Sequence, residues 1–260
     1  MTQRHTIRRE LRALAKDAAP ELKSLERRLF LRHGLNAGLS LGALSLLTGC
    51  SATTPSGVQS ILSQMSQFNN WVQGALFNPN RLAPTFTEAD ITKPFPFNAY
   101  YSQGESPVVG RGSYKLELGG MIADRKPWTL EQLAALPQQS QITRHCCVEG
   151  WSAIGQWGGV PLRAFLEKVG ADLTAKYVGF KCADNYYSSI DMASALQPQT
   201  ILALTYGGKE LPVDYGFPMK LRIPTKLGFK NPKHIMALYV TNVYPGGYWE
   251  DQGYNWFSGM

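Results

Sequence analysis

Two segments far apart in the sequence constrain this chain more than any other feature. The first is the octapeptide from Arg144 to Trp151, which holds adjacent thiols at Cys146 and Cys147. The second is a basic cluster over residues 220–234, which begins about 75 residues later. A thiolate is a soft ligand suited to a transition metal, and a dense basic cluster suits a phosphate. A fold that joins the two segments would suit a metal carried by a phosphate-bearing organic cofactor.

The first fifty residues are predicted to be a targeting leader that is not part of the fold. Residues 27–32, Arg-Arg-Leu-Phe-Leu-Arg, form a twin-arginine core. The weakly apolar stretch 34–49 that follows has 16 residues, short of the roughly 20 that cross a bilayer as a helix. Residues 47–50, Leu-Thr-Gly-Cys, have the pattern of a lipoprotein cleavage box, in which Cys50 would be lipidated. The alternatives are a core helix and an uncleaved membrane anchor.

This leader predicts a periplasmic or extracytoplasmic location. We expect the Tat translocase as a partner, with a membrane tether through Cys50. Because the Tat route carries proteins that are already folded, a cofactor assembled in the cytoplasm would travel inside the protein. Three cysteines remain after Cys50, and their odd number leaves at least one thiol outside intramolecular pairing.

Positive charge is concentrated in the leader. Residues 1–49 hold nine of the 26 Lys and Arg and four of the 19 Asp and Glu, a net charge of +5 out of +7. The remainder has 17 basic and 15 acidic residues, a net charge of +2. The high isoelectric point is therefore mostly a property of the leader, and it gives no reason to expect nucleic acid as a partner.

The composition changes twice after the leader. Residues 51–95 are rich in Ser, Gln, Asn, Pro and Thr, which predicts a linker and an irregular docking segment. The helical spacing of Ile61, Met65, Phe68 and Val72 permits one amphipathic helix there. The remaining residues, 96–260, are predicted to form one domain with a substantial core.

Short strands dominate that domain. Alternating or apolar runs predict strands at 114–118, 177–182, 219–224 and 235–243. A helix is expected to begin after Thr129 as its N-cap, and another to cover 160–170 with Pro161 near its start. Gly119 and Gly120 are expected to stop the first strand, and Gly170 the second helix. This mixture of short strands and few helices predicts an α+β fold.

Several motifs together resemble a known family. They are Cys147–Trp151, Trp157–Leu162, Leu211–Pro218 and the basic block from Lys220 to Lys233. In this order they are similar to the sulfite oxidase superfamily of molybdopterin-dependent oxidoreductases, and most of all to periplasmic methionine-sulfoxide reductase catalytic subunits. The resemblance covers roughly residues 95–250. It implies a β-rich mixed domain that binds one molybdenum–molybdopterin per chain.

The resemblance places the molybdenum ligand at Cys147, for which an inert packed thiol is the alternative. It also implies a set of cofactor contacts at Asn98, Tyr101, Cys182, Tyr215, Lys220, Asn231, Pro232 and Lys233. Cys182 and Tyr215 stand where the reductases have Thr and Asn, and Cys146 stands where they tend to have Arg. In an extended segment, neighbouring side chains point to opposite faces, so Cys146 and Cys147 would not easily bind one metal.

The residues that flank the ligand are further candidates. Arg144 and His145 would present positive charge to an anionic or oxo-bearing substrate, and Tyr186 and Tyr187 would line the pocket wall. Ordinary packing or surface roles are the alternative for all four residues.

The basic block itself is expected to bind the cofactor phosphate. Lys220 and Arg222 share one strand face, and Lys226, Lys230, Lys233 and His234 would continue the positive charge. Charge-assisted hydrogen bonds from such a cluster are what a phosphate requires. A solvated basic face is the alternative.

The implied activity is two-electron oxygen-atom transfer on a small or protein-borne sulfur or oxo substrate. A separate electron carrier, either a cytochrome or a quinol-linked membrane subunit, is expected, because the chain has no Cys-x-x-Cys-His motif and too few cysteines for an iron–sulfur cluster. Sulfite oxidation would favour arginines around an anion pocket, and sulfoxide reduction would favour a neutral pocket. Both directions stay open.

Two alternatives belong to other classes of protein. One is a non-catalytic, surface-tethered binding domain, which the retention of Cys147 beside an intact basic block disfavours. The other is a thiol–disulfide protein that uses Cys146 and Cys147, which lack the usual two-residue spacer.

Overall fold

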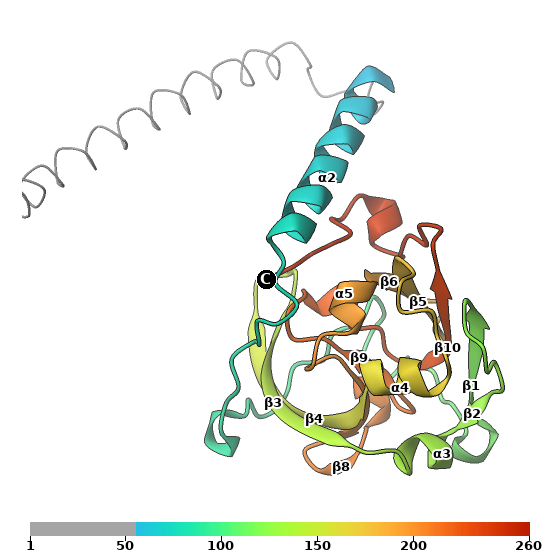
Figure 1. The fold of residues 1–260 in the computed structure, drawn as a ribbon. Helices are drawn as coiled ribbons and strands as arrows, with labels where there is room; N and C mark the ends of the chain where they lie inside the picture. The colour runs from blue at the N-terminus through green and yellow to red at the C-terminus, as the bar shows by residue number, and fades with distance from the viewer. Residues whose placement is uncertain (1–55) are drawn as a thin grey trace, which may run out of the picture. The chain divides into compact units, whose positions relative to one another are not determined.

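The computed structural model describes residues 56–260, so the predicted Tat leader and Cys50 lie outside the described residues. Contacts divide the chain into a unit of residues 1–61 and a unit of residues 62–260, and the fold and the site described below belong to the second unit. Figure 1 shows this unit as strongly curved strands with short helices between them. The α-helices within residues 56–260 are α2 (Ser56–Leu76), α3 (Leu130–Ala134), α4 (Leu162–Lys168) and α5 (Met192–Ala195).

In the described part of the chain, ten strands form two five-stranded sheets. The first has the order β2-β1-β10-β5-β6, and the second has the order β3-β4-β7-β8 with β9 paired to β7. Only the pairing of β1 with β10 is parallel, so the first sheet is mixed. The strands are β1 (Lys115–Gly120), β2 (Trp128–Thr129), β3 (Gln139–Cys146), β4 (Ser152–Pro161), β5 (Tyr177–Cys182), β6 (Tyr187–Asp191), β7 (Ile201–Tyr206), β8 (Lys209–Glu210), β9 (Lys220–Arg222) and β10 (Ile235–Thr241). The predicted α+β, β-rich architecture is confirmed.

Local sequence signals account for several of these elements. The side chain of Thr129 accepts a hydrogen bond from the Gln132 N–H, and the Gln132 side chain accepts from the Thr129 N–H, which completes a capping box at the start of α3. The predicted strands at 177–182 and 235–243 appear as β5 and β10. Local propensity and capping are sufficient to explain these elements.

Two boundaries differ from the prediction. Gly119 and Gly120 do not stop β1 but are its last two residues, and Gly120 has φ +71°, where a Cβ would lie 2.0 Å from the Val240 carbonyl oxygen. The helix expected from residue 160 begins only at Leu162, because Pro161 still pairs with β7 as the end of β4. In both cases the pairing of strands overrides the local signal.

The main core draws on both sheets and on α3 and α4. Phe165 of α4, Phe180 of β5 and Leu221 of β9 are all fully buried within it. Phe165 also meets Trp128 edge to face at 5.4 Å between ring centroids. Burying each such side chain contributes roughly 1.5–3 kcal/mol. Leu221 thus anchors β9 in this core, and β9 carries two of the cations of the site.

The segment before the first sheet runs along the second sheet. The N–H groups of Phe86 and Thr92 donate to the carbonyls of Ile142 in β3 and Ile154 in β4, both at 3.0 Å. Phe95 is buried in a second, smaller apolar cluster around Trp157. The amphipathic helix permitted within 51–95 is present as α2. Within residues 56–260, no helix combines the length and apolar character that crossing a bilayer requires.

Candidate active site

Cys147 occupies the first position of the tight turn that joins β3 to β4. Its N–H donates to the Trp151 carbonyl at 2.9 Å, and the Gly150 N–H donates to the Cys147 carbonyl at 3.2 Å. Gly150 has φ +94°, a conformation that glycine adopts without steric cost. Cys147 lines a pocket, whereas Cys146, the last residue of β3, is not among the lining residues. The two adjacent thiols therefore have different environments.

The Cys147 thiol lies close to a carboxylate. Its Sγ is 3.7 Å from Oε2 of Glu149, and the same oxygen accepts a hydrogen bond from Trp151 Nε1 at 2.9 Å. Burial raises the pKa of the Cys147 thiol, and the negative charge of Glu149 raises this pKa further. Without a metal the thiol therefore keeps its proton near neutral pH, and a bound cation would reverse that preference.

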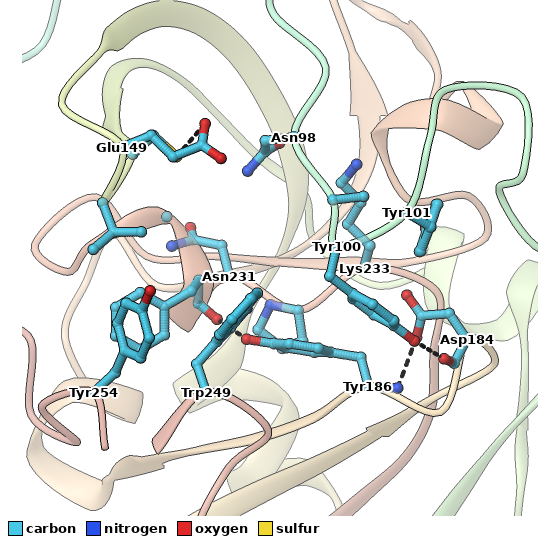
Figure 2. A pocket seen from close by; sticks show the side chains of 16 residues that line it. Asn98, Tyr100, Tyr101, Glu149, Asp184, Tyr186, Asn231, Lys233, Trp249 and Tyr254 are labelled. Atoms are coloured by element: carbon cyan, nitrogen blue, oxygen red, sulfur yellow. Dashed lines mark hydrogen bonds between the residues drawn. The ribbon is translucent and has the colours of Figure 1, made fainter. Parts of the chain in front are cut away.

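The pocket brings together many of the residues that the resemblance implied. Lining residues come from the segment before the first sheet, from the Cys147 turn, from the β5–β6 turn, from the block after β9 and from the C-terminal segment. Figure 2 shows how these side chains converge. The predicted site residues that line the pocket are Asn98, Tyr101, Cys147, Tyr186, Asn231, Pro232 and Lys233.

Aromatic rings form one side of the pocket. In Figure 2 Tyr186, Trp249 and Tyr254 lie along one side, and Asn98 and Glu149 lie on the opposite side. The rings of Trp249 and Tyr254 are 5.2 Å apart between centroids. This wall gives the pocket an aromatic side.

A second carboxylate lines the pocket. Oδ1 of Asp184 accepts a hydrogen bond from the Tyr186 N–H at 3.0 Å, and the Tyr100 hydroxyl donates to the Asp184 carbonyl. Burial raises the pKa of Asp184 above its usual range. Sequence reasoning assigned no role to Asp184, Glu149, Trp249 or Tyr254. Glu149 lies inside the octapeptide. The dense aromatic content of residues 248–257 was the sequence signal that could have indicated the aromatic wall with Trp249 and Tyr254.

β9 places two buried cations close to the Cys147 turn. Arg222 is fully buried and has several protein acceptors, including the Arg144 carbonyl at 2.6 Å and Oδ1 of Asn231 at 3.1 Å. Lys220 is also buried, and its Nζ lies 4.9 Å from the centroid of the Trp157 ring. Among the residues described, the Lys220 ammonium has no hydrogen-bond partner.

Electrostatics connects Lys220 to the thiol. Burial lowers the pKa of Lys220 well below 10.5, and the positive charges of Lys233 and Arg222 lower it further. Negative charge at Cys147 acts in the opposite direction. An anion bound near Cys147 would therefore stabilise the charged form of Lys220.

Lys233 and His234 follow the Asn231–Pro232 turn. Nζ of Lys233 donates to the Asp214 carbonyl at 2.6 Å, and burial lowers the pKa of Lys233 to about 8. Nδ1 of His234 donates to the Phe217 carbonyl at 2.7 Å, so its Nε2 accepts from the Tyr101 hydroxyl at 3.1 Å. Burial lowers the pKa of His234 to about 4. His234 is therefore neutral near pH 7 and positions Tyr101, contrary to its predicted share in the positive charge.

Two other lysines of the basic block do not serve the pocket. Nζ of Lys226 lies 3.1 Å from Oδ2 of Asp191, and Lys230 pairs with Glu250. Both lysines are fully buried, so the solvated basic face is excluded as well. The expectation that Lys226 and Lys230 extend a phosphate site is wrong, because each already has a carboxylate partner within the core.

The residues that precede Cys147 also differ from the prediction. His145 is fully buried, its Nε2 accepts from Nδ2 of Asn98 at 3.2 Å, and burial lowers its pKa well below 6.5. Arg144 is exposed, with its guanidinium carbon 5.1 Å from the centroid of the Phe86 ring. Neither residue lines the pocket. His145 supports Asn98 from behind the wall, and a buried neutral ring does not present positive charge to a substrate.

Two further predicted contacts lie away from the pocket lining. The N–H of Cys182 donates to the Tyr186 carbonyl at 2.9 Å, which places this thiol at the base of the β5–β6 turn. The Tyr215 hydroxyl donates to the Phe95 carbonyl at 2.9 Å, and Tyr215 lines a separate hollow with Phe95 and Tyr206. Lys220 is likewise behind the lining.

The donor set fits a metal carried by an anionic organic group. Cys147 offers one soft ligand in a pocket, and Lys220 is a buried cation without a partner among the described residues. Within residues 56–260, no group of three or more His, Cys, Asp and Glu is placed to hold a metal ion. The described side chains would thus give the metal one thiolate and leave further ligands to the group that carries it.

Comparison with known proteins identifies the family. Residues 103–249 match the family described as the oxidoreductase molybdopterin binding domain. The chain belongs to this family. The predicted membership of the sulfite oxidase superfamily is confirmed, and the protein is a molybdopterin-type oxidoreductase.

The relatives agree with this assignment. The chain is 61% identical over 251 residues to the "Putative protein-methionine-sulfoxide reductase subunit YedZ1" of Azospira oryzae, covering 96% of this chain and 94% of the relative. It is 29% identical over 264 residues to the protein-methionine-sulfoxide reductase catalytic subunit MsrP of Pseudomonas syringae pv. tomato, covering 90% and 77%. The sulfane dehydrogenase SoxCD of Paracoccus pantotrophus shares the fold, with a TM-score of 0.50, 19% identity and coverage of 53% of this chain and 40% of that one.

Proposed function

We propose that this protein is the catalytic part of an extracytoplasmic reductase for methionine sulfoxide, free or within proteins. In this proposal one molybdenum–molybdopterin binds per chain, with Cys147 as the protein ligand of the metal. The names of the two relatives support the substrate, because both are described as protein-methionine-sulfoxide reductase subunits.

The observation that carries the proposal is the thiol of Cys147 in a pocket backed by the unpartnered ammonium of Lys220. When bound, the cofactor supplies oxygen-atom transfer coupled to two electrons. Lys220 and Lys233 would balance its negative charge. Asn98, Tyr101, Asn231 and Pro232 line the pocket and would contact the cofactor, while Cys182 and Tyr215 would act from behind the wall.

The pocket favours a neutral sulfoxide over a sulfite anion. Glu149 lines the pocket as a carboxylate, and its negative charge repels an anion. Arg144 does not line the pocket and the buried His145 is neutral, so neither compensates for that repulsion. The aromatic wall that includes Tyr186 suits the apolar part of a methionine side chain.

Sulfoxide reduction consumes two protons and two electrons and releases a thioether and water. Asp184 lies in the pocket, and burial raises its pKa, so it holds a proton at a higher pH than an exposed carboxyl group. We assign Asp184 as a proton donor to the departing oxygen. The electrons would come singly from a cytochrome or a quinol-linked membrane subunit. The Tat leader and a lipid on Cys50 would place the enzyme beside such a partner.

Metal and pterin analysis of protein exported from a Tat-competent host tests the proposal. About one molybdenum per chain is expected, lost in Cys147→Ser and kept in Cys146→Ser, the matched control on the adjacent thiol. Turnover of methionine sulfoxide with an artificial electron donor, and none of sulfite, is expected from the same preparation. Correctly exported protein that contains no molybdenum would refute the assignment of Cys147.

A further inference from the structure

An apolar stripe on α2 is exposed. Met65, Phe68, Trp71 and Leu76 keep 51%, 61%, 68% and 79% of their surface accessible. Over its 21 residues α2 contains no Asp, Glu, Lys or Arg. The periodic apolar pattern in the sequence thus produces a helix, but this face has no partner among the described residues. An uncharged helix with large exposed apolar side chains is costly to leave in water.

The orientation of this stripe is fixed by the opposite face of α2. Oδ1 of Asn70 accepts from Nδ2 of Asn255 at 2.8 Å and from the Phe257 N–H at 3.1 Å. Oε1 of Gln73 accepts from the Gly259 N–H at 3.2 Å. Because successive residues of a helix are 100° apart, these polar contacts and the apolar stripe lie on different faces.

The chemistry of the stripe matches a lipid surface. Amphipathic helices with Trp, Phe and Leu on one face lie in the bilayer interface, where aromatic side chains are favoured. Only residues 51–55 separate Cys50 from the start of α2. Five residues span at most about 18 Å, so a lipid on Cys50 would hold the helix at the membrane.

We propose that the stripe formed by Met65, Phe68, Trp71 and Leu76 docks onto the surface of a lipid bilayer. The tether that brings it there rests on the proposed lipidation of Cys50, whereas the affinity of the stripe does not. Stable membrane attachment commonly needs two signals, and the stripe would be the second.

Docking in this way would also orient the pocket. Asn255 hydrogen-bonds to α2, and its neighbour Tyr254 lines the pocket. The aromatic wall is thus continuous along the chain with the segment that holds the docked helix. The pocket would then have one fixed orientation relative to an electron donor within the membrane.

Co-flotation with protein-free phosphatidylcholine vesicles tests the proposal. Every sample is the full chain carrying Cys50→Ser, so the acyl anchor is absent and the leader is common to all. Phe68→Ser with Trp71→Ser is expected to lower the partition coefficient by tenfold or more, because two large apolar side chains leave the interface. Gln64→Ser with Gln67→Ser, the matched control on exposed polar positions, should change it by less than about twofold. Binding should persist in high salt, because the stripe carries no charge.

Several results would overturn the proposal. One is equal flotation of the stripe variant and its parent, and another is flotation that requires anionic lipid and low salt. The third is binding only to membranes that contain a protein partner, and the fourth is a dimer in sedimentation that depends on the stripe. Each of these four results would count against docking onto lipid. Near-ultraviolet circular dichroism shows whether each variant is folded. Molybdenum content and sulfoxide turnover are measured on the same samples, so a protein that floats without molybdenum would refute the proposed function and leave the docking surface standing.

Discussion

Replacing Lys220 by methionine should change the free energy of unfolding and cofactor binding in opposite directions. The Lys220 ammonium is buried and has no hydrogen-bond partner among the described residues, and burial lowers its pKa well below 10.5. Methionine keeps the apolar stem and removes the charge. The cofactor-free Lys220→Met protein should therefore be more stable than the parent, whereas the loaded form should retain less molybdenum.

The magnitude follows from proton linkage. Each pH unit between the folded pKa of Lys220 and 10.5 costs the folded state about 1.4 kcal/mol, because the unfolded chain holds a proton that the folded protein has released. Neutralisation thus limits the penalty near pH 7 to about 5 kcal/mol. We expect Lys220→Met to gain stability near pH 7, by no more than this limit, and the gain to shrink as the pH rises towards 10.5.

Urea unfolding of cofactor-free protein at about pH 7 and about pH 9.5 measures this difference. With a slope of about 2–3 kcal/mol/M, the Lys220→Met midpoint should rise at the lower pH, by at most about 2 M, and by much less at the higher one. Lys209→Met, the same change at an exposed lysine, is the control and should leave the midpoint unchanged. A Lys220→Met protein that is less stable than its parent near pH 7, or that has the same pH dependence, would refute the reasoning.

Three further predictions concern neighbouring features. Glu250→Gln leaves the buried Lys230 ammonium without a counter-charge and should cost about 3–5 kcal/mol in urea unfolding, and a loss below 1 kcal/mol would contradict the role of this pair. Gly159→Ala would place a Cβ 1.9 Å from the Leu202 carbonyl oxygen, so we expect the melting temperature to fall by at least about 8 °C. An unchanged melting temperature would show that β4 and β7 can separate at this position. Lys233 has a pKa of about 8, so sulfate binding by the cofactor-free protein should weaken above that pH in calorimetry and lose this dependence in Lys233→Met.

Local patterns were sufficient for elements whose partners are close in sequence. Thr129 was predicted as an N-cap because its capping partner is three residues away, and the structure has this cap. The start of the next helix was misplaced at residue 160 because Pro161 is fixed by its pairing with Ile201, forty residues later. No local signal in the sequence reports such a pairing.

In the site, too, some residues were predicted from local patterns and others are brought together only by the tertiary fold. Cys147 and Lys233 were predicted from the family motif, and both line the pocket. The motif did not distinguish Lys230 from Lys233, because the partner of Lys230 is Glu250 in the C-terminal segment. Trp249 was missed for a similar reason, since only the tertiary fold brings that segment to the pocket.

The buried cations have two kinds of environment, with or without a carboxylate partner. This difference separates the structural lysines from the lysine of the site. Lys226 and Lys230 each pair with a buried carboxylate, so their charge is balanced inside the core. Arg222 and Lys220 form no ion pair with any described carboxylate, and Lys220 lacks even a neutral acceptor. Burial lowers the pKa of Lys220 well below 10.5, and negative charge at Cys147 acts in the opposite direction. An anionic cofactor bound beside Cys147 would therefore supply the negative charge that keeps Lys220 protonated.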